Sequence, residues 1–555
     1  AARVRVMPPR TLLARMNERF NVLLSRAGRQ DRQATLRAAF DWSWELLSDA
    51  EKAALAQLSV FEGGFTLDTA EAVLELATPG GRAEAVDVVH WLVDKSFVRQ
   101  LANERFDLLE SVREYAGEHL RTADRYAGSG PEARAAAERR HGAFFAHVEA
   151  KQVIAGRCAE LDNVVTACRR AAARGDSEVA ALALDSAWFG LKLRGPFRVA
   201  LELAEKVRAT PQLSETATVT LDCVSGKAAM ATGDMAQARL RLEAAAARAA
   251  SGSSAIDQAR ALGALGELHV HEGRFEEARA CYARTLAAAK ASDDASIQCG
   301  ALSGLGVCAE CLGDATAAQT LFLQVLAIAR ETEDRRWEGG ALGNLGQLHA
   351  NQGRLDQART LYEQALAIAR ELGDRQWEGN VSCNLGLLHH AQGRMDEASS
   401  QLESALAIAR QLGHSRLESV VLCNLGIVQV ALGQYPLAGR SYQAALQIAR
   451  DLGDRRSEGQ FLGYLGELLA RQGDFGTARD CVRLGAHLLR ALADQISLGV
   501  LLCAQAEIEH RAGDRGAERA ALDEAEHLAM QCGIEPDSEF GVALARARDA
   551  AQCPA

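Results

Sequence analysis

Three asparagines recur at one place in successive segments of the sequence, and their side chains offer the chemistry of peptide recognition. Asn344, Asn384 and Asn424 follow one another at intervals of 40 residues. A side-chain amide both donates and accepts hydrogen bonds, which suits the backbone of an extended peptide. If helices carry all three toward a concave surface, they form a ladder of amides. The alternative is a repeated structural residue that bonds the neighbouring helix.

Other polar residues are expected beside this ladder. In the helix register that turns Leu345 and Gly346 inward, residues three or four positions apart share the opposite side. The predicted peptide- or protein-binding groove therefore contains further polar side chains. These are Gln347, Asn351, His390, Arg471 and Arg511.

Cysteine and histidine spacings do not complete a metal site. Cys308-x-x-Cys311 has the spacing of half a site, but the second pair or the two histidines are missing. The cysteines at 383, 423 and 503 share one repeat position with glycines of sister segments, which favours small, packed thiols. The histidines at 269, 349 and 389 also share one position, and packing explains them. We expect no metal.

Nucleotide or hydrolytic chemistry has no motif in this sequence. A phosphate-binding loop needs Gly-x-x-x-x-Gly-Lys followed by a hydroxyl residue. At the one Gly-Lys pair, Gly226-Lys227, the first glycine is replaced by Leu221 and the hydroxyl residue by Ala228. The sequence therefore predicts a chain that is not an enzyme and holds no cofactor.

Charge and composition exclude several classes of protein. With 62 Lys+Arg against 73 Asp+Glu, the net charge of −11 excludes a globally basic nucleic-acid binder. The predicted groove is mixed in charge, because glutamates at 267, 310, 467 and 507 share its side, and this disfavours a phosphate backbone. No run approaches the length of a membrane span. The 13 scattered cysteines indicate buried thiols in a reducing cytoplasm.

The spacing of glycines predicts the helices that position the amides of Asn344, Asn384 and Asn424. The sequence has 48 glycines among residues that otherwise favour helices, and many of them stand at two positions of a 40-residue repeat. A period this strict is typical of a solenoid. The first position is filled by Gly226, Gly266, Gly306, Gly346, Gly386, Gly426 and Gly466. The second is filled by Gly233, Gly273, Gly313, Gly353, Gly393, Gly433, Gly473 and Gly513.

Each repeat is predicted to be two helices. Gly346 lets them approach closely, and Gly353 ends the first helix with a positive φ. Ala358 and Tyr362 begin the buried stripe of the second. Leu345-Gly346, Gly353, Ala358 and Tyr362 resemble the signature of the tetratricopeptide repeat, here with a period longer than the usual 34 or so. The resemblance implies a right-handed superhelix with a concave binding surface.

The repeats set the predicted domain boundaries. The array covers 217–536 in seven or eight units, and 537–555 is a C-terminal tail. Residues 127–216 are expected to be a helical linker with degenerate repeats, because Gly195 and Ala200 keep the spacing of the turn glycine and the small residue.

Junctions between the repeats carry aromatic and basic residues. Trp337 and Trp377 are interpreted as packing between repeats rather than as a stacking platform for bases. Arginines such as Arg336, Arg416 and Arg456 are interpreted as a solvated rim, with recognition of an acidic partner as the alternative.

Residues 34–126 have a different pattern. Helical periodicity over 35–47, 49–60, 66–76 and 84–95 is followed by two short strands, Ser96–Leu101 and Arg105–Leu109, and by a helix over 112–120. Helices closed by a hairpin describe a winged helix. The expected fold class is thus mostly all-α: a winged-helix domain with a small β-hairpin, followed by an α-solenoid of tetratricopeptide repeats.

Several of these segments resemble a known signalling family. Thr35–Ser48, Leu58–Phe65, Leu92–Ser96 and Leu108–Ala116 are similar to the winged-helix segment of bacterial signal-transduction ATPases with numerous domains, the STAND class with its NB-ARC-like core. A winged helix followed by tetratricopeptide repeats is that family's own order. The resemblance implies that the basic segment 1–33 is a linker, the tail of an ATPase core missing from this chain.

Two features bear on nucleotide and DNA. Relatives of this class carry Met-His-Asp at the second strand, with the histidine touching the bound diphosphate, whereas Arg105-Phe106-Asp107 stand here. That contact is therefore not carried over. The helix over 84–95, which would enter a DNA groove, has three acidic residues against one lysine, whereas DNA contacts need exposed Arg, Lys, Asn or Gln.

We therefore expect the regulatory and sensor half of a STAND-type signalling protein, a cytoplasmic transcriptional regulator. A peptide or protein effector would bind the repeat superhelix, which with the winged helix would control an ATPase switch. The second expected partner is an intramolecular nucleotide-binding domain in the full-length parent. The alternatives are a plain tetratricopeptide scaffold for protein–protein interaction and DNA binding by the winged helix.

Overall fold

The structure is a computed structural model, and it describes residues 30–76, 84–101, 104–148, 158–251, 254–492, 494–534, 536 and 538–552. Most of these residues are helical, and the described ranges hold one sheet, of two strands. They form two compact units, the first ending at Phe145 and the second beginning at Ala146. The linker predicted over 1–33 lies outside the described residues except where a helix begins at Gln30.

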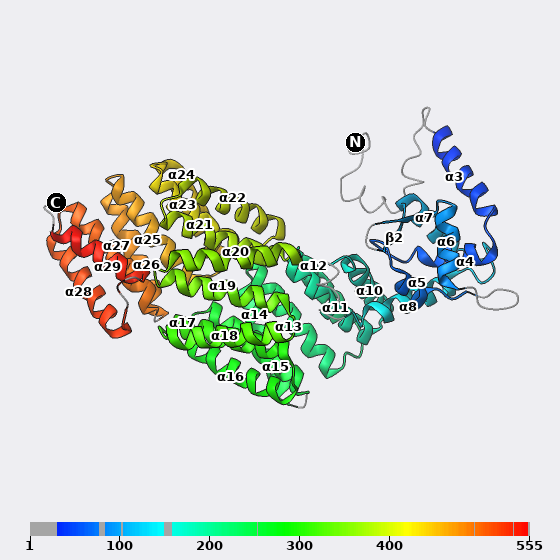
Figure 1. Cartoon of the computed structure of the whole chain (residues 1–555), viewed down its shortest axis with the longest axis horizontal. Coiled ribbons are helices and arrows are strands. Elements are labelled where there is room, and N and C mark those ends of the chain that lie inside the picture. Colours follow the sequence, from blue (N-terminus) through cyan, green and yellow to red (C-terminus); the bar gives the residue numbers. More distant parts are fainter. Residues whose placement is uncertain are drawn as a thin grey trace. The chain divides into compact units, whose positions relative to one another are not determined.

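The first unit combines helices with the hairpin (Figure 1). Tyr115 of its last-but-one helix donates its hydroxyl to Asp41, 2.7 Å away, and Trp44 and Phe65 are buried in its core. Its elements are α3 (Gln30–Glu45), α4 (Asp49–Leu58), α5 (Leu67–Val73), α6 (Ala85–Asp94), β1 (Val98–Gln100), β2 (Phe106–Leu108), α7 (Glu110–Arg121) and α8 (Pro131–Phe145).

The hairpin is antiparallel and joins the helices through an additional bridge. Val98 lies opposite Leu108, and Gln100 lies opposite Phe106. Phe65, which precedes α5, exchanges backbone hydrogen bonds with Phe106, both of 2.8 Å. The helices and the hairpin expected over 34–126 are thus confirmed in type and order, while the identity of this unit as a winged helix stays a prediction.

The second unit is a solenoid of helix pairs (Figure 1). It begins with α10 (Leu161–Arg174), α11 (Ser177–Arg194) and α12 (Phe197–Arg208). The pairs that follow within the described residues are α13 (Glu215–Thr232) and α14 (Met235–Ala250), α15 (Ala255–His271) and α16 (Phe275–Ala291), α17 (Ala295–Cys311) and α18 (Ala315–Glu331), α19 (Arg335–Asn351) and α20 (Leu355–Leu372), α21 (Arg375–Ala391) and α22 (Met395–Leu412), α23 (Ser415–Ala431) and α24 (Tyr435–Asp451), α25 (Arg455–Arg471) and α26 (Phe475–Ala491), and α27 (Gln495–Ala512) and α28 (Arg515–Cys532). The expected fold class is confirmed.

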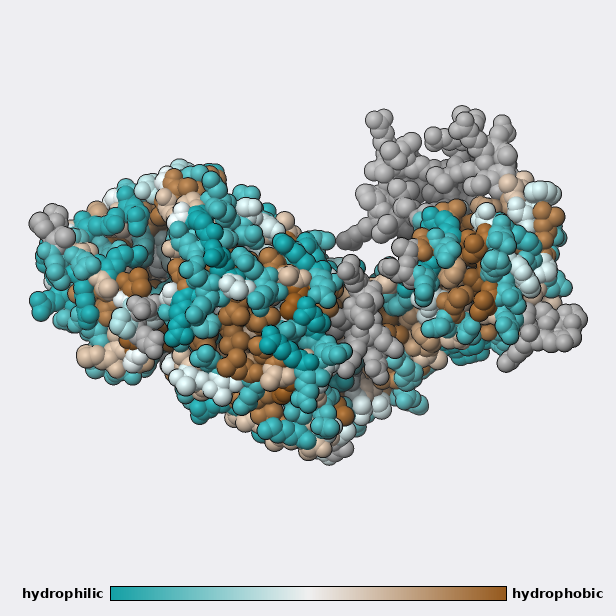
Figure 2. Space-filling view, viewed as in Figure 1, coloured by the Kyte–Doolittle hydropathy of each residue, from teal (hydrophilic) through white to brown (hydrophobic). Residues whose placement is uncertain are grey.

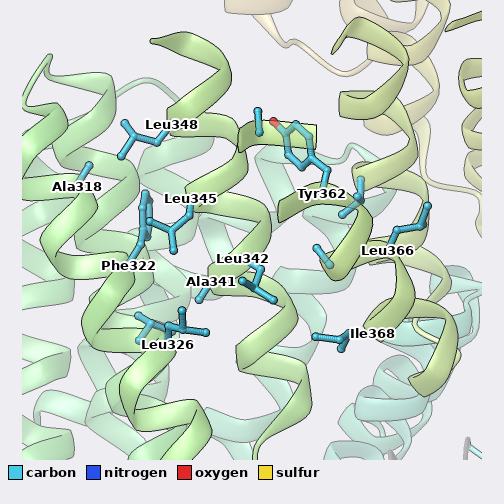
Figure 3. Packing of buried hydrophobic residues seen from close by; sticks show 14 of the residues in the cluster. Ala318, Phe322, Leu326, Ala341, Leu342, Leu345, Leu348, Tyr362, Leu366 and Ile368 are labelled. Atoms are coloured by element: carbon cyan, nitrogen blue, oxygen red, sulfur yellow. The ribbon is translucent and has the colours of Figure 1, made fainter. Parts of the chain in front are cut away.

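One repeat shows how the two glycine positions work. At Gly346, a Cβ atom would lie 2.9 Å from ring carbons of Tyr362, so α19 and α20 touch where no side chain intervenes. Gly353 ends the first helix with φ +72°. Figure 3 shows the resulting core, in which Leu345 faces Phe322 of α18 and Tyr362 extends from α20. The predicted roles of both glycines are confirmed.

The solenoid turns back on itself. Helix α11 contacts α21, and α13 contacts α23. At these crossings Phe197 packs edge-on against His414, with ring centroids 5.5 Å apart, and a Cβ atom on Gly233 would lie 1.7 Å from Leu452 Cδ2. Successive turns therefore touch directly and leave a half-open space between them.

The end of the array is covered by a helix. The segment predicted only as a C-terminal tail contains α29 (Glu539–Gln552), which packs on α27. Phe540 is 1% exposed and lies against Gly499 of α27. Helix α29 therefore closes the apolar face that the last repeat would otherwise expose.

Candidate functional site

A cavity of about 420 Å³ lies inside the repeat solenoid, between its successive turns. Its walls come from α11, α12, α13 and α15 on one side and from α19, α21 and α23 on the other. Indole and phenyl rings stand beside amides and charged groups. The lining residues are Trp188, Lys192, Phe197, Lys227, Met230, Ala231, Glu267, His271, Gly343, Asn344, Gln347, Gln376, Trp377, Asn380, Cys383, Asn384, His414, Arg416, Leu417 and Val420.

Two of the three predicted asparagines line this cavity. Asn344 donates its amide to Ser303 Oγ of α17, at 3.0 Å, and Asn384 shares a side-chain hydrogen bond with Tyr362. Each amide is thus oriented by the preceding repeat and still lies at the wall of the cavity. These hydrogen bonds fix the orientation of both amides.

Asn424 is placed differently. Its side chain is 8% exposed and donates to Cys383 Sγ at 3.2 Å. Asn424 lies behind the cavity wall and bonds the neighbouring helix. It therefore acts as a structural residue of the repeat, which was the alternative to a peptide-binding amide. The structure therefore brings Asn344 and Asn384 together at one surface and leaves Asn424 in the packing between repeats.

Gln347 and Asn351 continue from the cavity wall as a chain of hydrogen bonds. Gln347 accepts from the Tyr362 hydroxyl at 3.0 Å and donates to Asn351 at 2.8 Å. Asn351 in turn donates to Glu310 at 2.8 Å. Burial raises the pKa of the Glu310 carboxyl to about 7, against the opposing effect of Asn351. Gln347 thus belongs to the cavity, and Asn351 supports it from behind.

The remaining predicted site residues lie elsewhere. His390 is half-buried, and burial lowers its pKa. Arg471 and Arg511 line a separate, very small hollow with Glu467 and Glu507. The predicted groove is therefore divided in the structure, and the larger site is the cavity.

The cationic residues of the cavity were missed from the sequence, whereas Glu267 was expected on this side. Lys192 lies in α11, within the segment predicted to hold degenerate repeats. Lys227 follows Gly226, which fills the first glycine position of its repeat. Arg416 was interpreted as part of a solvated rim, but it lines the cavity, where its guanidinium contacts His271. No local sequence motif predicts that these residues lie together. Helices α11 and α13 contact α21 and α23 because the solenoid completes a turn between them.

Burial controls the protonation of these groups. Burial lowers the pKa of Lys192 to about 8, although Glu267 opposes the shift. Burial and the charge of Arg416 lower the pKa of His271 to about 3. For Glu267, burial acts to raise the pKa, and Lys192 and Lys227 together bring it below its ordinary value. At neutral pH the cavity therefore holds a charged Lys192 and a neutral His271 imidazole.

Within the described ranges, no three His, Cys, Asp or Glu side chains gather as a metal site, and no helix is long and apolar enough to cross a membrane. Burial raises the pKa of Cys308 to about 12 and that of Cys311 to about 11. Both thiols are thus protonated at neutral pH.

Two segments of the first unit were expected to bear on nucleotide and DNA binding: Arg105–Asp107 at the second strand, and the helix α6. Asp107 accepts from Arg99 at 2.8 Å and from Arg113 at 3.1 Å, so this carboxylate is already paired. On α6, Val86 and Trp91 are each 43% exposed. Hydrophobic residues gather over this helix (Figure 2).

Curated relatives match a short part of the chain. An uncharacterized protein of Mycobacterium tuberculosis is 41% identical over 125 residues, which is 22% of this chain and 32% of that protein. A second protein of the same organism, provisionally named an HTH-type transcriptional regulator, is 38% identical over 126 residues, 22% of this chain and 14% of its own length. The match thus spans a third or less of these relatives.

One solved structure shares the solenoid fold, and a second resembles it more weakly. A Rap protein complexed with competence and sporulation factor superposes with a TM-score of 0.51 at 14% identity, covering 64% of this chain and 99% of that one. A STAND protein with a tetratricopeptide repeat sensor from Pyrococcus horikoshii covers 92% of this chain and 67% of its own at 16% identity. Its TM-score of 0.39 is too low for the two folds to be equated.

Family models identify the repeats themselves. A model described as tetratricopeptide repeat matches residues 297–371, 337–411 and 417–486, and a second model of the same description matches 261–296. These segments coincide with the helix pairs from α15 to α26. Residues 261–411 and 417–486 are therefore tetratricopeptide repeats, and they form the middle of the solenoid that encloses the cavity.

Proposed function

We propose that this chain is the regulatory and sensor part of a STAND-type signalling protein that controls transcription. The observation that carries the proposal is the order of its two units. A helical unit with a hairpin, whose segments resemble the winged helix of that class, precedes a tetratricopeptide solenoid with an internal cavity. A peptide or protein effector binds the solenoid, and binding shifts a nucleotide-binding core outside residues 1–555 between two states.

The solenoid supports the sensor role. Solenoids of this kind bind ligands on their concave side. Here that side carries Asn344, Asn384 and Gln347 at the wall of the cavity. The preceding repeat orients the first two amides, and Tyr362 of the same repeat orients that of Gln347. The Rap protein, whose solved structure contains a bound factor, has the same solenoid fold.

The first unit supports a protein partner over DNA. The exposed side of α6 carries Val86 and Trp91, and its first turn carries Asp87. Exposed apolar residues mark a surface for another protein, whereas a groove-binding helix presents cationic and amide side chains. We therefore place the nucleotide-binding core against this helix. A salt-sensitive affinity of residues 34–125 for duplex DNA would overturn this assignment.

A joint change of Asn344, Asn384 and Asn424 to alanine tests the effector site. In the protein that includes the nucleotide-binding core, effector-dependent release of a fluorescent diphosphate should be lost while basal release is retained. A matched control replaces Gln298 and Gln447, amides on helices α17 and α24 that do not line the cavity. Unchanged effector response in the triple variant would contradict the proposal.

The same experiment separates the switch from a plain scaffold. A scaffold binds its partner with equal affinity whether or not a nucleotide-loaded core is attached. A switch requires the affinity for the effector and the affinity for the nucleotide to change together, because the coupling is reciprocal.

A further inference from the structure

The two lysines of the cavity lack the ion pairs that other cations of the solenoid have. Arg416 lies 3.5 Å from Asp454, and Arg336 lies 3.9 Å from Asp374. Among the described residues, neither Lys192 nor Lys227 has a carboxylate within 4.0 Å. At longer range, Glu267 faces both lysines and Asp374 faces Lys192. The cavity thus holds an excess of positive charge that its own walls do not neutralise.

Such an excess is costly in a half-enclosed space. Removing an ammonium group from water is unfavourable unless an anion or hydrogen-bond acceptors replace the lost hydration. The lowered pKa of Lys192 reflects this desolvation. An anion placed between the two lysines would supply the missing partner and accept charge-assisted hydrogen bonds from both ammonium groups.

The other walls define the rest of the ligand. Trp188, Phe197 and Trp377 present aromatic surface to the same space, while Asn344, Asn380 and Asn384 present amides. A volume of about 420 Å³ matches a small molecule, since small-molecule pockets span about 300–1,000 Å³. A folded domain does not fit, and an aromatic ring with an acidic group does.

We propose that the cavity binds one small organic anion that carries an aromatic ring, with its carboxylate or phosphate between Lys192 and Lys227 and its ring against Trp188 and Trp377. The inference rests on the proposed function for its regulatory meaning, and it differs from it in the effector, which becomes a small aromatic anion in place of a peptide or protein. It also predicts a mechanical effect. The ligand contacts α11 and α13 on one side and α21 on the other, so it joins two turns of the solenoid.

Calorimetric titration of the whole chain tests the proposal with defined probes. Indole-3-acetate supplies a carboxylate, phenyl phosphate supplies a phosphate, and phenethylamine supplies a similar ring with the opposite charge. One or both anions should bind with a stoichiometry of one, and phenethylamine should not bind. The stronger of the two anions identifies the acidic group. Equal binding of phenethylamine, or no binding of either anion, would overturn the proposal.

Substitution of the lysines locates the site. Lys192→Met and Lys227→Met keep most of the side-chain volume and should each weaken anion binding by about tenfold or more, because a charge-assisted contact contributes about 1.5–3 kcal/mol. Lys290→Met, at an exposed position of α16, is the matched control and should leave binding unchanged. Undiminished binding by the Lys192/Lys227 double variant would place the anion elsewhere.

The outcome is separable from that of the proposed function. If the aromatic anions fail to bind but a peptide effector acts through Asn344 and Asn384, this inference fails and the sensor role stands. If the anions bind through the lysines but leave the release of nucleotide from an attached core unchanged, the cavity assignment stands and the switch fails.

Discussion

Phe197 packs edge-on against His414, one turn of the solenoid further along the chain, with ring centroids 5.5 Å apart and ring planes at 83°. Both residues also line the cavity. Burial and the neighbouring charge of Arg416 lower the pKa of His414 to about 4, so the imidazole is neutral at physiological pH and packs as an aromatic ring. The contact therefore joins two turns and closes the cavity at the same place.

Two turn glycines test whether contact between the turns keeps the solenoid closed. Gly233 has φ +91°, and its Cβ position lies 1.7 Å from Leu452 Cδ2 of the next turn. Asparagine tolerates this backbone conformation, so Gly233→Asn acts mainly through its bulk. We expect the turns to separate, at a cost of about 1–3 kcal/mol, with a larger radius of gyration in small-angle X-ray scattering.

Gly273→Asn is the control for this prediction. Gly273 has φ +74°, and no atom lies within 4 Å of its Cβ position. This variant should keep the radius of gyration and cost about 1 kcal/mol or less, from the positive φ alone. An equal expansion of both variants would mean that the effect comes from the backbone and not from contact between the turns.

A second pair of glycines tests packing inside one repeat. Gly346→Ala places a methyl group 2.9 Å from ring carbons of Tyr362, a residue that is 1% exposed, and should destabilise α19 by about 1–3 kcal/mol. Gly340→Ala, on the same helix, meets nothing within 4 Å and should stabilise it by about 1 kcal/mol. Hydrogen exchange of α19, read by mass spectrometry, measures both changes. If both variants destabilised α19, or both stabilised it, the close contact between Gly346 and Tyr362 would not be the cause.

The repeat was predictable from the sequence because its packing is local. Gly346 meets Tyr362 of the next helix, and Gly353 acts on its own backbone, so a single unit contains the cause and the effect. Each repeat meets mainly its neighbours, which preserves one pattern at one period. The same logic predicted the helices and the hairpin of the first unit.

The cavity was not predictable because its cause is not local. The distance between Lys192 and the helix of Asn384 depends on small rotations added over several repeats, and no single residue encodes that sum. Asn424 shares its repeat position with Asn344 and Asn384, yet it is buried against Cys383. Equivalent sequence positions therefore acquire different surroundings.

The pKa of Lys192 predicts how anion binding depends on pH. Burial lowers this pKa to about 8, and the groups that face it are Glu267, Lys227, Arg336 and Asp374. Raising the pH from 7 to 9 removes the proton from Lys192 and with it one of the two charges between which the anion lies. We expect the affinity for indole-3-acetate to fall by about tenfold over this range, as measured by calorimetry.

Two observations control the pH experiment. The carboxylate of indole-3-acetate stays ionised throughout, and burial keeps His271 neutral because its pKa is about 3. Lys192→Arg keeps its charge at every pH used, so its profile should be flat. A profile that falls equally in Lys192→Arg would assign the titration to another group.

The terminal helix should stabilise the last repeat through one aromatic residue. Phe540 of α29 is 1% exposed and lies against Gly499, whose Cβ position is 2.0 Å from the ring. Phe540→Ala should lower the free energy of local unfolding of α27 and α28 by about 3–5 kcal/mol, because it removes a buried ring. Gly499 has no side chain that could fill the space left by the ring. Hydrogen exchange should then rise in α27 and stay constant in α19. Val542→Ala, at a side chain 57% exposed on the same helix, should change neither. Unchanged protection of α27 in Phe540→Ala would show that the array ends stably without this helix.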